Sequence, residues 1–409
     1  MDRQDFDFEA AFAPGLPAPA PRFTGFPRFN FIGGHNDPAQ IPVEGLIEAA
    51  AAALKRDGQA LALYNLGQGP QGYRPLRQFL SDKLSSVRGI RAEAEDILIT
   101  SGSGQGIDLV TRLLVRPGDC VLAEEFTYGG ALNRMRALGA KVVGVKLDDQ
   151  GIDIAALHAQ LAEMAGRGEK PKFLYTIPTI QNPTGSVLPL ERRHALLELA
   201  RAFDLPIFED ECYADLTWAL DAPPALAALD PGRVIHIGSF SKSLAPALRV
   251  GYATAPWAVL SRMIACKSDG GTGALDQMVA AEFFTHHYAG HMQRLHGALS
   301  GKLAVMTEAL AAEFGTSVEM FAPKGGIFLW LRLPEGVDVR KLVAPAAAAG
   351  LVFNPGPEWA CDAEAAQSHL RLCFALPDAA TIRDGVATFA RVCFEETGIP
   401  ARGANRTRS

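Results

Sequence analysis

Several features are missing from this 409-residue sequence, and each absence excludes a class of protein. The six cysteines include no CxxC pair, which argues against a zinc ribbon or a redox motif and is typical of reduced thiols. The net charge of −6 comes without a basic stripe, so no nucleic-acid partner is expected. The longest apolar run, residues 342–353, contains a proline and a glycine. It is shorter than the roughly 18 residues that a membrane span needs, so no membrane partner is expected.

The acidic N-terminal sequence MDRQDFDFEA lacks the basic and apolar regions of a signal peptide. We therefore expect a cytoplasmic protein. No internal repeat is visible, which argues against a solenoid. The paired histidines His287 and His291 have helical i,i+4 spacing, but no HExxH pattern accompanies them, and no metal site is expected.

Apolar segments that read as strands alternate with helical segments through the first two thirds of the chain. Expected strands cover residues 96–100, 120–125, 141–147, 172–177, 206–210 and 234–239, and expected helices cover residues 43–56, 106–115 and 190–203. This alternation predicts an α/β fold with a mostly parallel sheet covered by helices on both faces. After residue 290 the pattern changes to a long helix, residues 291–314, and short strands at 317–323, 326–333 and 369–376, which predicts a smaller α+β domain.

The predicted domain boundaries follow from these changes in pattern. Residues 1–42 form an N-terminal arm, rich in Pro and Phe, together with a segment of the small domain. Residues 43–290 form the large domain, residues 291–399 the small C-terminal domain, and residues 400–409 a flexible tail.

Polar residues follow five of the predicted strands, at the points where ligands bind in open α/β sheets. The segment SGSGQG, residues 101–106, opens a helix and suits an anion, although a tight turn would explain it equally. Tyr128, Asn182, Asp210 and Lys242 follow the ends of other strands. Together they offer an anion cradle, an aromatic face, an amide, a carboxylate and an amine. This combination indicates a site for pyridoxal 5'-phosphate (PLP), a flat phosphorylated heterocycle that bonds covalently to a lysine.

A resemblance to a known family rests on seven motifs that occur in family order between about Gly33 and Phe394. They are SGSGQG, EEFTYGG, QNPTG, EDECY, SFSKSLAPALRVGY, PKGGIFLW and HLRLCF. With these motifs the chain resembles the class I/II aminotransferases, the fold-type I PLP-dependent transferases, and is most similar to the 2-aminoadipate and kynurenine aminotransferases. The resemblance implies a cytoplasmic enzyme of amino acid metabolism or biosynthesis. Its substrates would be an amino acid and a 2-oxo acid, and its homodimer would form the active site at the interface.

The resemblance also implies a role for individual residues. Lys242 would hold the cofactor as a Schiff base and move the α-proton in a ping-pong transamination, and Asp210 would keep the pyridine nitrogen protonated. Asn182 and Tyr213 would bond the phenolic oxygen, and Tyr128 would stack on the ring. Arg371 would bind the substrate α-carboxylate. The implied phosphate site consists of Ser103, Gly104, Gln105, Ser239, Ser241 and Arg249, with Tyr64 from the partner subunit.

Three positions depart from the family pattern. Gly104 stands where many relatives have a glutamine, so a phosphate contact there could come only from the backbone. Gly34 is expected near the substrate, and the adjacent His35 either faces the substrate or lies in a solvated turn. Tyr64 is followed by a longer spacing than the family pattern predicts.

Two alternatives to transamination remain open at this stage. The first is other PLP chemistry on an amino acid, namely elimination, decarboxylation, oxidation or carbon–carbon bond formation, because a fold does not fix a reaction. Arg371 disfavours decarboxylation, since it favours substrates that keep their carboxylate. The second is the effector-binding module of a transcription regulator. This reading lacks support because residues 1–40 contain no helix-turn-helix pattern.

Overall fold

The computed structural model describes residues 6–13, 16, 19–20, 22–219, 221–321 and 323–400. Its large domain is built on a seven-stranded sheet with the strand order β2-β10-β9-β8-β7-β3-β4. In that order, the strands are Ile97–Thr100, Gly251–Thr254, Val234–Ser239, Ile207–Asp210, Leu174–Thr176, Cys120–Glu124 and Lys141–Val145. All neighbouring pairs are parallel except those of β10, which is antiparallel to both β2 and β9. The predicted mostly parallel α/β sheet is thus confirmed, with β10 as a strand that the sequence pattern did not reveal.

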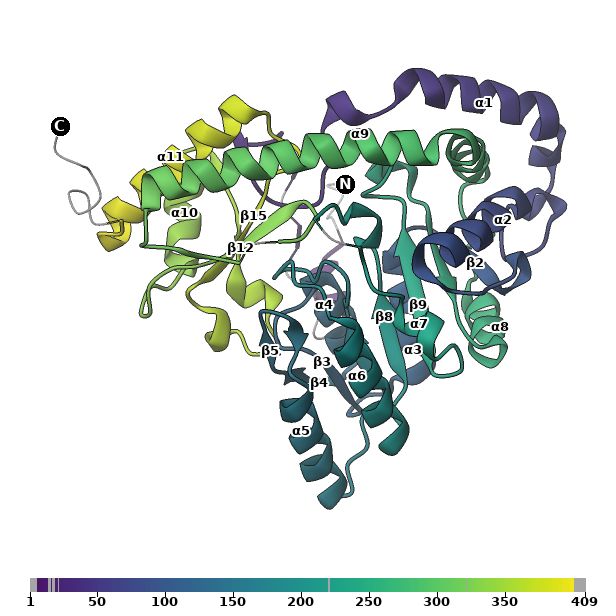
Figure 1. The fold of residues 1–409 in the computed structure, drawn as a ribbon, viewed down its shortest axis with the longest axis horizontal. Helices are drawn as coiled ribbons and strands as arrows, with labels where there is room; N and C mark the ends of the chain where they lie inside the picture. The colour runs from purple at the N-terminus through teal and green to yellow at the C-terminus, as the bar shows by residue number, and fades with distance from the viewer. Residues whose placement is uncertain are drawn as a thin grey trace, which may run out of the picture.

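Helices cover both faces of this sheet (Figure 1). Along β2, Ile97 and Ile99 pack into one apolar core and Leu98 into another on the opposite face, as expected for a strand buried on both sides. The Leu98 core includes α3 (Ser103–Leu114), α4 (Gly129–Ala137) and α8 (Trp257–Cys266). The other core includes α2 (Arg74–Lys83), α5 (Ile154–Gly166), α6 (Leu190–Ala202) and the short α7 (Leu226–Leu229). A small hairpin, β5 (Leu147–Asp148) and β6 (Gly151–Ile152), precedes α5.

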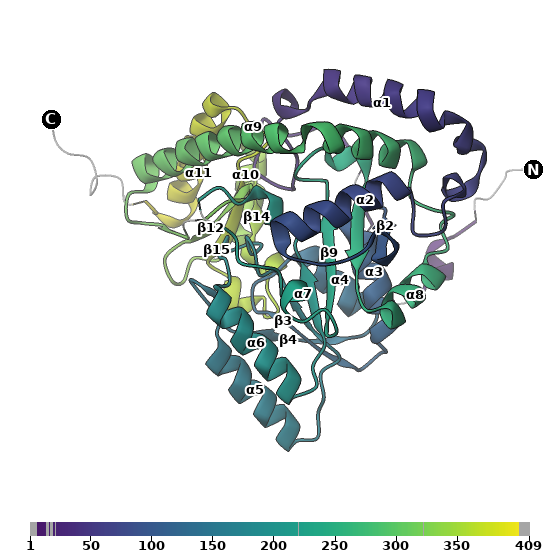
Figure 2. The same ribbon diagram turned by 45° about the vertical axis from the view of Figure 1, so that its right-hand side comes forward.

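One helix, α9 (Ala274–Phe314), is 41 residues long and crosses from the large domain into the small one (Figures 1 and 2). The predicted start of this helix at residue 291 is wrong, because the helix begins more than four turns earlier, at Ala274. Residues 274–290 continue the helix because they contain no proline and bury Met278, Phe283 and Phe284 against the large domain. Helix α1 (Val43–Asp57) lies alongside α9 at the top of both views.

The small domain contains a four-stranded antiparallel sheet in the order β11-β12-β15-β14. These strands span Glu319–Met320, Phe328–Arg332, His369–Cys373 and Asn354–Pro355, and β11 is shorter than the predicted strand over 317–323. Helices α10 (Arg340–Ala348) and α11 (Ala379–Thr397) pack with this sheet in one core. Strand β1 (Phe29–Asn30) pairs in parallel with β13 (Leu351–Val352), so the segment after the N-terminal arm joins the small domain. No helix in the described part of the chain is long and apolar enough to cross a membrane.

Candidate active site

A cavity of about 300 Å³ lies where strands β7, β8 and β9 end, between the large sheet and the small domain. The carboxyl ends of these parallel strands meet at one edge of the sheet, which is why Asp210 and Ser239 point into the same space. Most of the residues expected at the site line this cavity. They are Gly34, Ser103, Gly104, Tyr128, Asn182, Asp210, Tyr213, Ser239, Ser241, Lys242, Arg249 and Arg371.

Lys242 follows β9 and is partly buried. Its Nζ donates a hydrogen bond of 2.7 Å to the carbonyl oxygen of Gly34. Burial lowers the pKa of Lys242 to about 8, because the charged amine loses hydration. A substantial fraction of this lysine is therefore neutral near physiological pH, the form that a nucleophile or a general base requires.

Asp210 is the last residue of β8 and is buried. Its Oδ2 accepts a hydrogen bond of 2.7 Å from the hydroxyl of Tyr175, and its Oδ1 accepts one of 3.0 Å from the backbone N–H of Cys212. Burial raises the pKa of Asp210, while these two donors oppose the rise. A carboxylate held in this way can bind a protonated ring nitrogen. That nitrogen would be the cationic partner that a buried carboxylate needs.

Arg371 on β15 forms the opposite side of the cavity. Its Nη1 donates to Asn182 Oδ1 at 3.0 Å, and its Nη2 donates to the carbonyl of Gly33 and to Asn354 Oδ1, each at 2.9 Å. The guanidinium carbon lies 3.8 Å from the ring centroid of Trp359. Its Nε is buried and has no hydrogen-bond partner in the described structure. Arg371 therefore keeps donor capacity for an anionic group such as a carboxylate.

The loop that carries Asn182 is fixed by a buried carboxyl group. Glu124, at the end of β3, accepts from the Thr176 hydroxyl at 2.6 Å and from Gln181 Nε2 at 2.9 Å. The side-chain oxygen of Gln181 in turn accepts from the backbone and hydroxyl of Thr184, both at 2.8 Å. Burial raises the pKa of Glu124 to about 7. This network joins the ends of two strands and holds the Asn182 loop in place.

One end of the cavity, where the sequence predicts the phosphate site, is formed by the N-terminus of α3 and the loop after β9. Ser103 is the first residue of α3, where unpaired backbone N–H groups attract anions. Arg249 reaches this end: its Nη2 donates to the carbonyl of Ser101 at 3.3 Å. Gly251 is required beside the helix start, because a Cβ there would lie 2.7 Å from the backbone nitrogen of Ser103.

Three residues expected at the site do not line the cavity. Gln105 turns away: its Oε1 accepts from Ser101 N at 2.8 Å and its Nε2 donates to Asp269 at 2.7 Å. Its assignment as a side-chain ligand of the cofactor therefore has no support in this geometry. His35 packs against Phe26, with 5.3 Å between ring centroids, and burial and the charge of Lys242 both lower its pKa. Tyr64 lies on the surface and is 87% exposed, as a residue reserved for a partner subunit would be.

Four polar or aromatic residues line the cavity although the sequence analysis did not place them there: Arg134, Cys212, Asn354 and Trp359. Cys212 reaches the cavity beside Asp210, and its backbone N–H donates to Asp210 Oδ1. Asn354 could have been found only from strand register, since it pairs directly with Arg371 across β14 and β15. Trp359 follows the turn sequence NPGPE. This sequence does not predict that the Trp359 ring contacts the guanidinium of Arg371.

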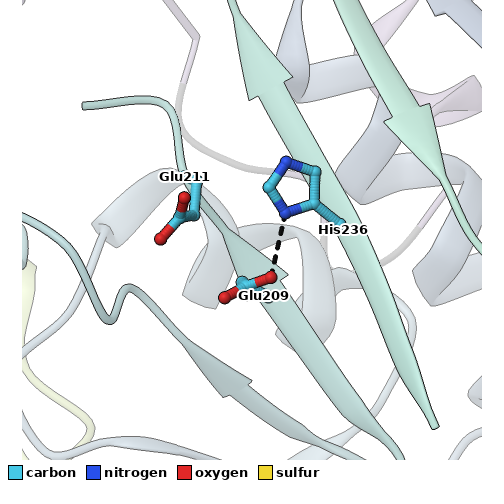
Figure 3. Close-up of side chains that lie close together, drawn as sticks. All are labelled: Glu209, Glu211 and His236. Carbon is cyan, nitrogen blue, oxygen red and sulfur yellow. Dashed lines mark hydrogen bonds and ion pairs between the residues drawn. The ribbon is translucent and has the colours of Figure 1, made fainter. Parts of the chain in front are cut away.

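A second cluster of titratable groups comprises Glu209, Glu211 and His236, which lie on β8, directly after β8 and on β9, respectively, and do not line the cavity (Figure 3). Figure 3 shows the His236 imidazole directed at Glu209, and the Nδ1 to Oε2 distance is 2.9 Å. Glu211 forms a bidentate pair with Arg88, at 2.6 and 2.7 Å. Because both carboxylates are already satisfied by donors, the cluster is better suited to holding β8 and β9 together than to binding a metal ion.

Comparisons with known proteins identify the family. The family model for class I and II aminotransferases matches residues 34–389. The 2-aminoadipate transaminase of Thermus thermophilus is 34% identical over 369 residues, which are 88% of this chain and 89% of that protein. Aromatic-amino-acid aminotransferase 1 of Thermococcus litoralis is 33% identical over 371 residues, 90% and 88% of the two chains. The crystal structure of the α-aminoadipate aminotransferase LysN of Thermus thermophilus, complexed with N-(5'-phosphopyridoxyl)-L-leucine, aligns with a TM-score of 0.82 and 32% identity. The alignment covers 90% of this chain and 93% of that one.

The chain belongs to the family of class I and II aminotransferases and has the fold-type I architecture. It is a PLP-dependent aminotransferase, which transfers an amino group from an α-amino acid to a 2-oxo acid. The residues of the cavity fit the cofactor. They provide a lysine with a lowered pKa, a buried carboxylate that forms no ion pair with any described residue, and a helix N-terminus with an arginine.

Proposed function

We propose that Lys242 and Arg371 position one amino acid between them. The observation that carries this proposal is that Lys242 Nζ bonds to the carbonyl of Gly34, while Arg371 Nη2 bonds to the carbonyl of the preceding residue, Gly33. The Lys242 amine and the Arg371 guanidinium thus both donate to carbonyl groups of the Gly33–Gly34 backbone. An amino acid bound with its carboxylate on Arg371 presents its α-carbon to Lys242.

In this arrangement Lys242 moves the proton that transamination requires. The cofactor, when bound, withdraws electrons from the α-carbon of the amino acid. Lys242 Nζ, once neutral, takes the α-proton as a general base. Asp210 would hold a proton on the ring nitrogen of the cofactor, and Asn182 and Tyr213, which line the same cavity, would bond its phenolic oxygen. Tyr128 lines the cavity, with its ring centroid 5.9 Å from that of Trp359, and would supply the aromatic face for the cofactor ring.

The donor is an α-amino acid whose carboxylate remains intact. The relatives named above act, by their names, on aromatic amino acids and on 2-aminoadipate, and both classes belong in a panel of candidate donors. We expect His35 to influence the choice of donor, because it follows Gly34 and its pKa senses the charge of Lys242.

The test is the visible absorption spectrum of the PLP-loaded protein while single amino acids are added without any oxo acid. We expect loss of the visible band and stoichiometric formation of the matching oxo acid for the true donor. Lys242→Ala should show neither change. Release of ammonia or carbon dioxide instead of oxo acid accumulation would overturn the proposed reaction. Turnover by Lys242→Ala at the wild-type rate would overturn the assigned role of the lysine.

We further propose that the active enzyme is a cytoplasmic homodimer. The support is a set of exposed apolar side chains on the N-terminal arm, on α1 and on the 3-10 turns that follow α1. They are Phe6, Phe8, Phe12, Leu16, Phe23, Phe26, Val43, Ile47, Leu54, Leu61, Leu63 and Tyr64. An exposed apolar surface of this kind typically marks a protein interface. In a dimer formed there, Tyr64 would be available to the partner's cofactor phosphate. Sedimentation should give a dimer for the wild type and a monomer for Ile47→Asp, and a monomeric wild type would refute the proposal.

A further inference from the structure

Arg134 occupies space that is open only because residue 104 is glycine. Arg134 lies on α4 and lines the cavity next to Ser103, Gly104 and Arg249. A Cβ built on Gly104 would lie 3.0 Å from Nη2 of Arg134. Any longer side chain at position 104 would therefore compete with the guanidinium for the space over the first turn of α3.

Among the described residues, the ion pair and the hydrogen bond of Arg134 involve its Nε and Nη1 and leave Nη2 without an acceptor. Its Nε lies 2.9 Å from Oδ1 of Asp108, which is on the same helix as Gly104, and its Nη1 donates to the carbonyl of Gly130 at 2.8 Å. In the described part of the chain no acceptor is found for Nη2, the nitrogen nearest Gly104. Two contacts therefore fix the plane of the guanidinium, and the remaining donor is directed over the start of α3.

We propose that Arg134 is a second guanidinium ligand of the cofactor phosphate and replaces the side chain that Gly104 lacks. The inference rests on the proposed phosphate site at the N-terminus of α3. A phosphate monoester carries close to two negative charges at neutral pH, and Arg249 supplies only one positive charge at this end. Arg134 supplies the second charge and can form a charge-assisted hydrogen bond through Nη2.

The position of Arg134 favours the phosphate over a carboxylate of the substrate. Its neighbours are α3, α4 and Gly104, whereas the substrate guanidinium, Arg371, contacts Gly33, Asn182 and Asn354. The hydroxyl groups of Ser103, Ser239 and Ser241 line the cavity with Arg134, as expected around a phosphate. The opposing hypothesis is that Arg134 binds the distal carboxylate of an acidic amino acid. It predicts that Arg134→Ala raises the KM for acidic donors and leaves the PLP affinity unchanged.

The test compares PLP with pyridoxal, which lacks the phosphate, as ligands of the cofactor-free protein. Quenching of tryptophan fluorescence is a suitable readout because Trp359 lines the cavity. Arg134→Ala should weaken PLP binding on the order of tenfold, the lower end for a hydrogen bond to a charged group, since the side chain is 35% exposed. The affinity for pyridoxal should not change. The loss should also shrink as salt is added, because a partly exposed charge is screened.

Two further variants serve as a rescue and as a control for this test. In the double variant Arg134→Ala/Gly104→Gln, the new amide occupies the vacated space and should restore most of the PLP affinity. Arg112→Ala removes an exposed arginine from the last turn of α3, far from the phosphate end, and should bind PLP like the wild type.

Two results would overturn the inference. They are an unchanged PLP affinity in Arg134→Ala and an equal loss of affinity for PLP and pyridoxal. If the PLP affinity is unchanged and the KM for acidic donors alone is raised, Arg134 belongs to the substrate site. Failure of the broader proposal would look different, because the wild-type protein would then fail to attach the cofactor to Lys242 in the first place.

Discussion

Gly34 leaves no room for a side chain, and replacing it with alanine tests how closely Lys242 must be held. A Cβ on residue 34 would lie 2.0 Å from Nζ and 3.0 Å from Cε of Lys242. A comfortable contact needs about 3.5 Å, so Nζ would have to move by roughly 1.5 Å. The backbone tolerates alanine because Gly34 does not have a positive φ, and the other neighbour, Ile327 Cδ1, is at an ordinary distance of 3.8 Å.

The displacement should affect the chemistry much more than the fold. Nζ would lose its 2.7 Å hydrogen bond to the carbonyl of Gly34 and its alignment with an amino acid on Arg371. A misplacement of about 1 Å in a catalytic group can cost on the order of 100-fold in rate, and we expect a loss of this size in kcat for Gly34→Ala. The lysine can swing away, so the melting temperature of the cofactor-free protein should change little.

Three measurements check this prediction: kcat with saturating cofactor, the rate of cofactor attachment, and the thermal melt of the cofactor-free protein. Gly301→Ala is a matched control, since Gly301 lies in α9 and a Cβ there meets no atom within 4 Å. If Gly34→Ala attaches the cofactor and turns over like the wild type, Lys242 does not depend on the Gly34 carbonyl. If instead the variant fails to fold, the close approach serves the fold and our reasoning about the lysine is wrong.

Three other predictions follow from the contacts of single side chains. Asp210→Asn should keep the cofactor but lose most of kcat, because an amide does not hold the ring nitrogen protonated, and unchanged turnover at equal cofactor content would contradict this. Cofactor attachment should slow about tenfold for each pH unit below the Lys242 pKa of about 8, and a flat stopped-flow profile between pH 6 and 8 would refute it. Arg88→Met should lower the free energy of unfolding in urea by about 3 kcal/mol, since it leaves the buried carboxylate of Glu211 without its bidentate partner. Adding Glu211→Gln should recover part of that loss, and a single variant as stable as the wild type would exclude the ion pair as a source of stability.

The strand-end residues were predictable from the sequence because a local rule fixes their position. Asp210 ends one buried strand and Lys242 follows the end of the next, and parallel strands place their carboxyl ends at one edge. Contacts between distant segments were not predictable in this way. Arg134 and Gly104 are 30 residues apart on different helices, and only the packing of α3 against α4 brings them together. Strand β10 was missed because four residues after the Arg249 turn carry too little periodicity to distinguish a strand from a loop.

The charges of the cavity explain why these residues are placed together. Lys242, Arg134, Arg249 and Arg371 line it, whereas Asp210 is its only carboxylate among the described lining residues. Such an excess of positive charge in a partly buried space is unfavourable by itself. A phosphate and a carboxylate relieve it at two different places, one at the start of α3 and one at Arg371. The cavity therefore suits a ligand pair with anionic groups at both ends and a protonated nitrogen between them, which is the charge pattern of pyridoxal phosphate bound together with an amino acid.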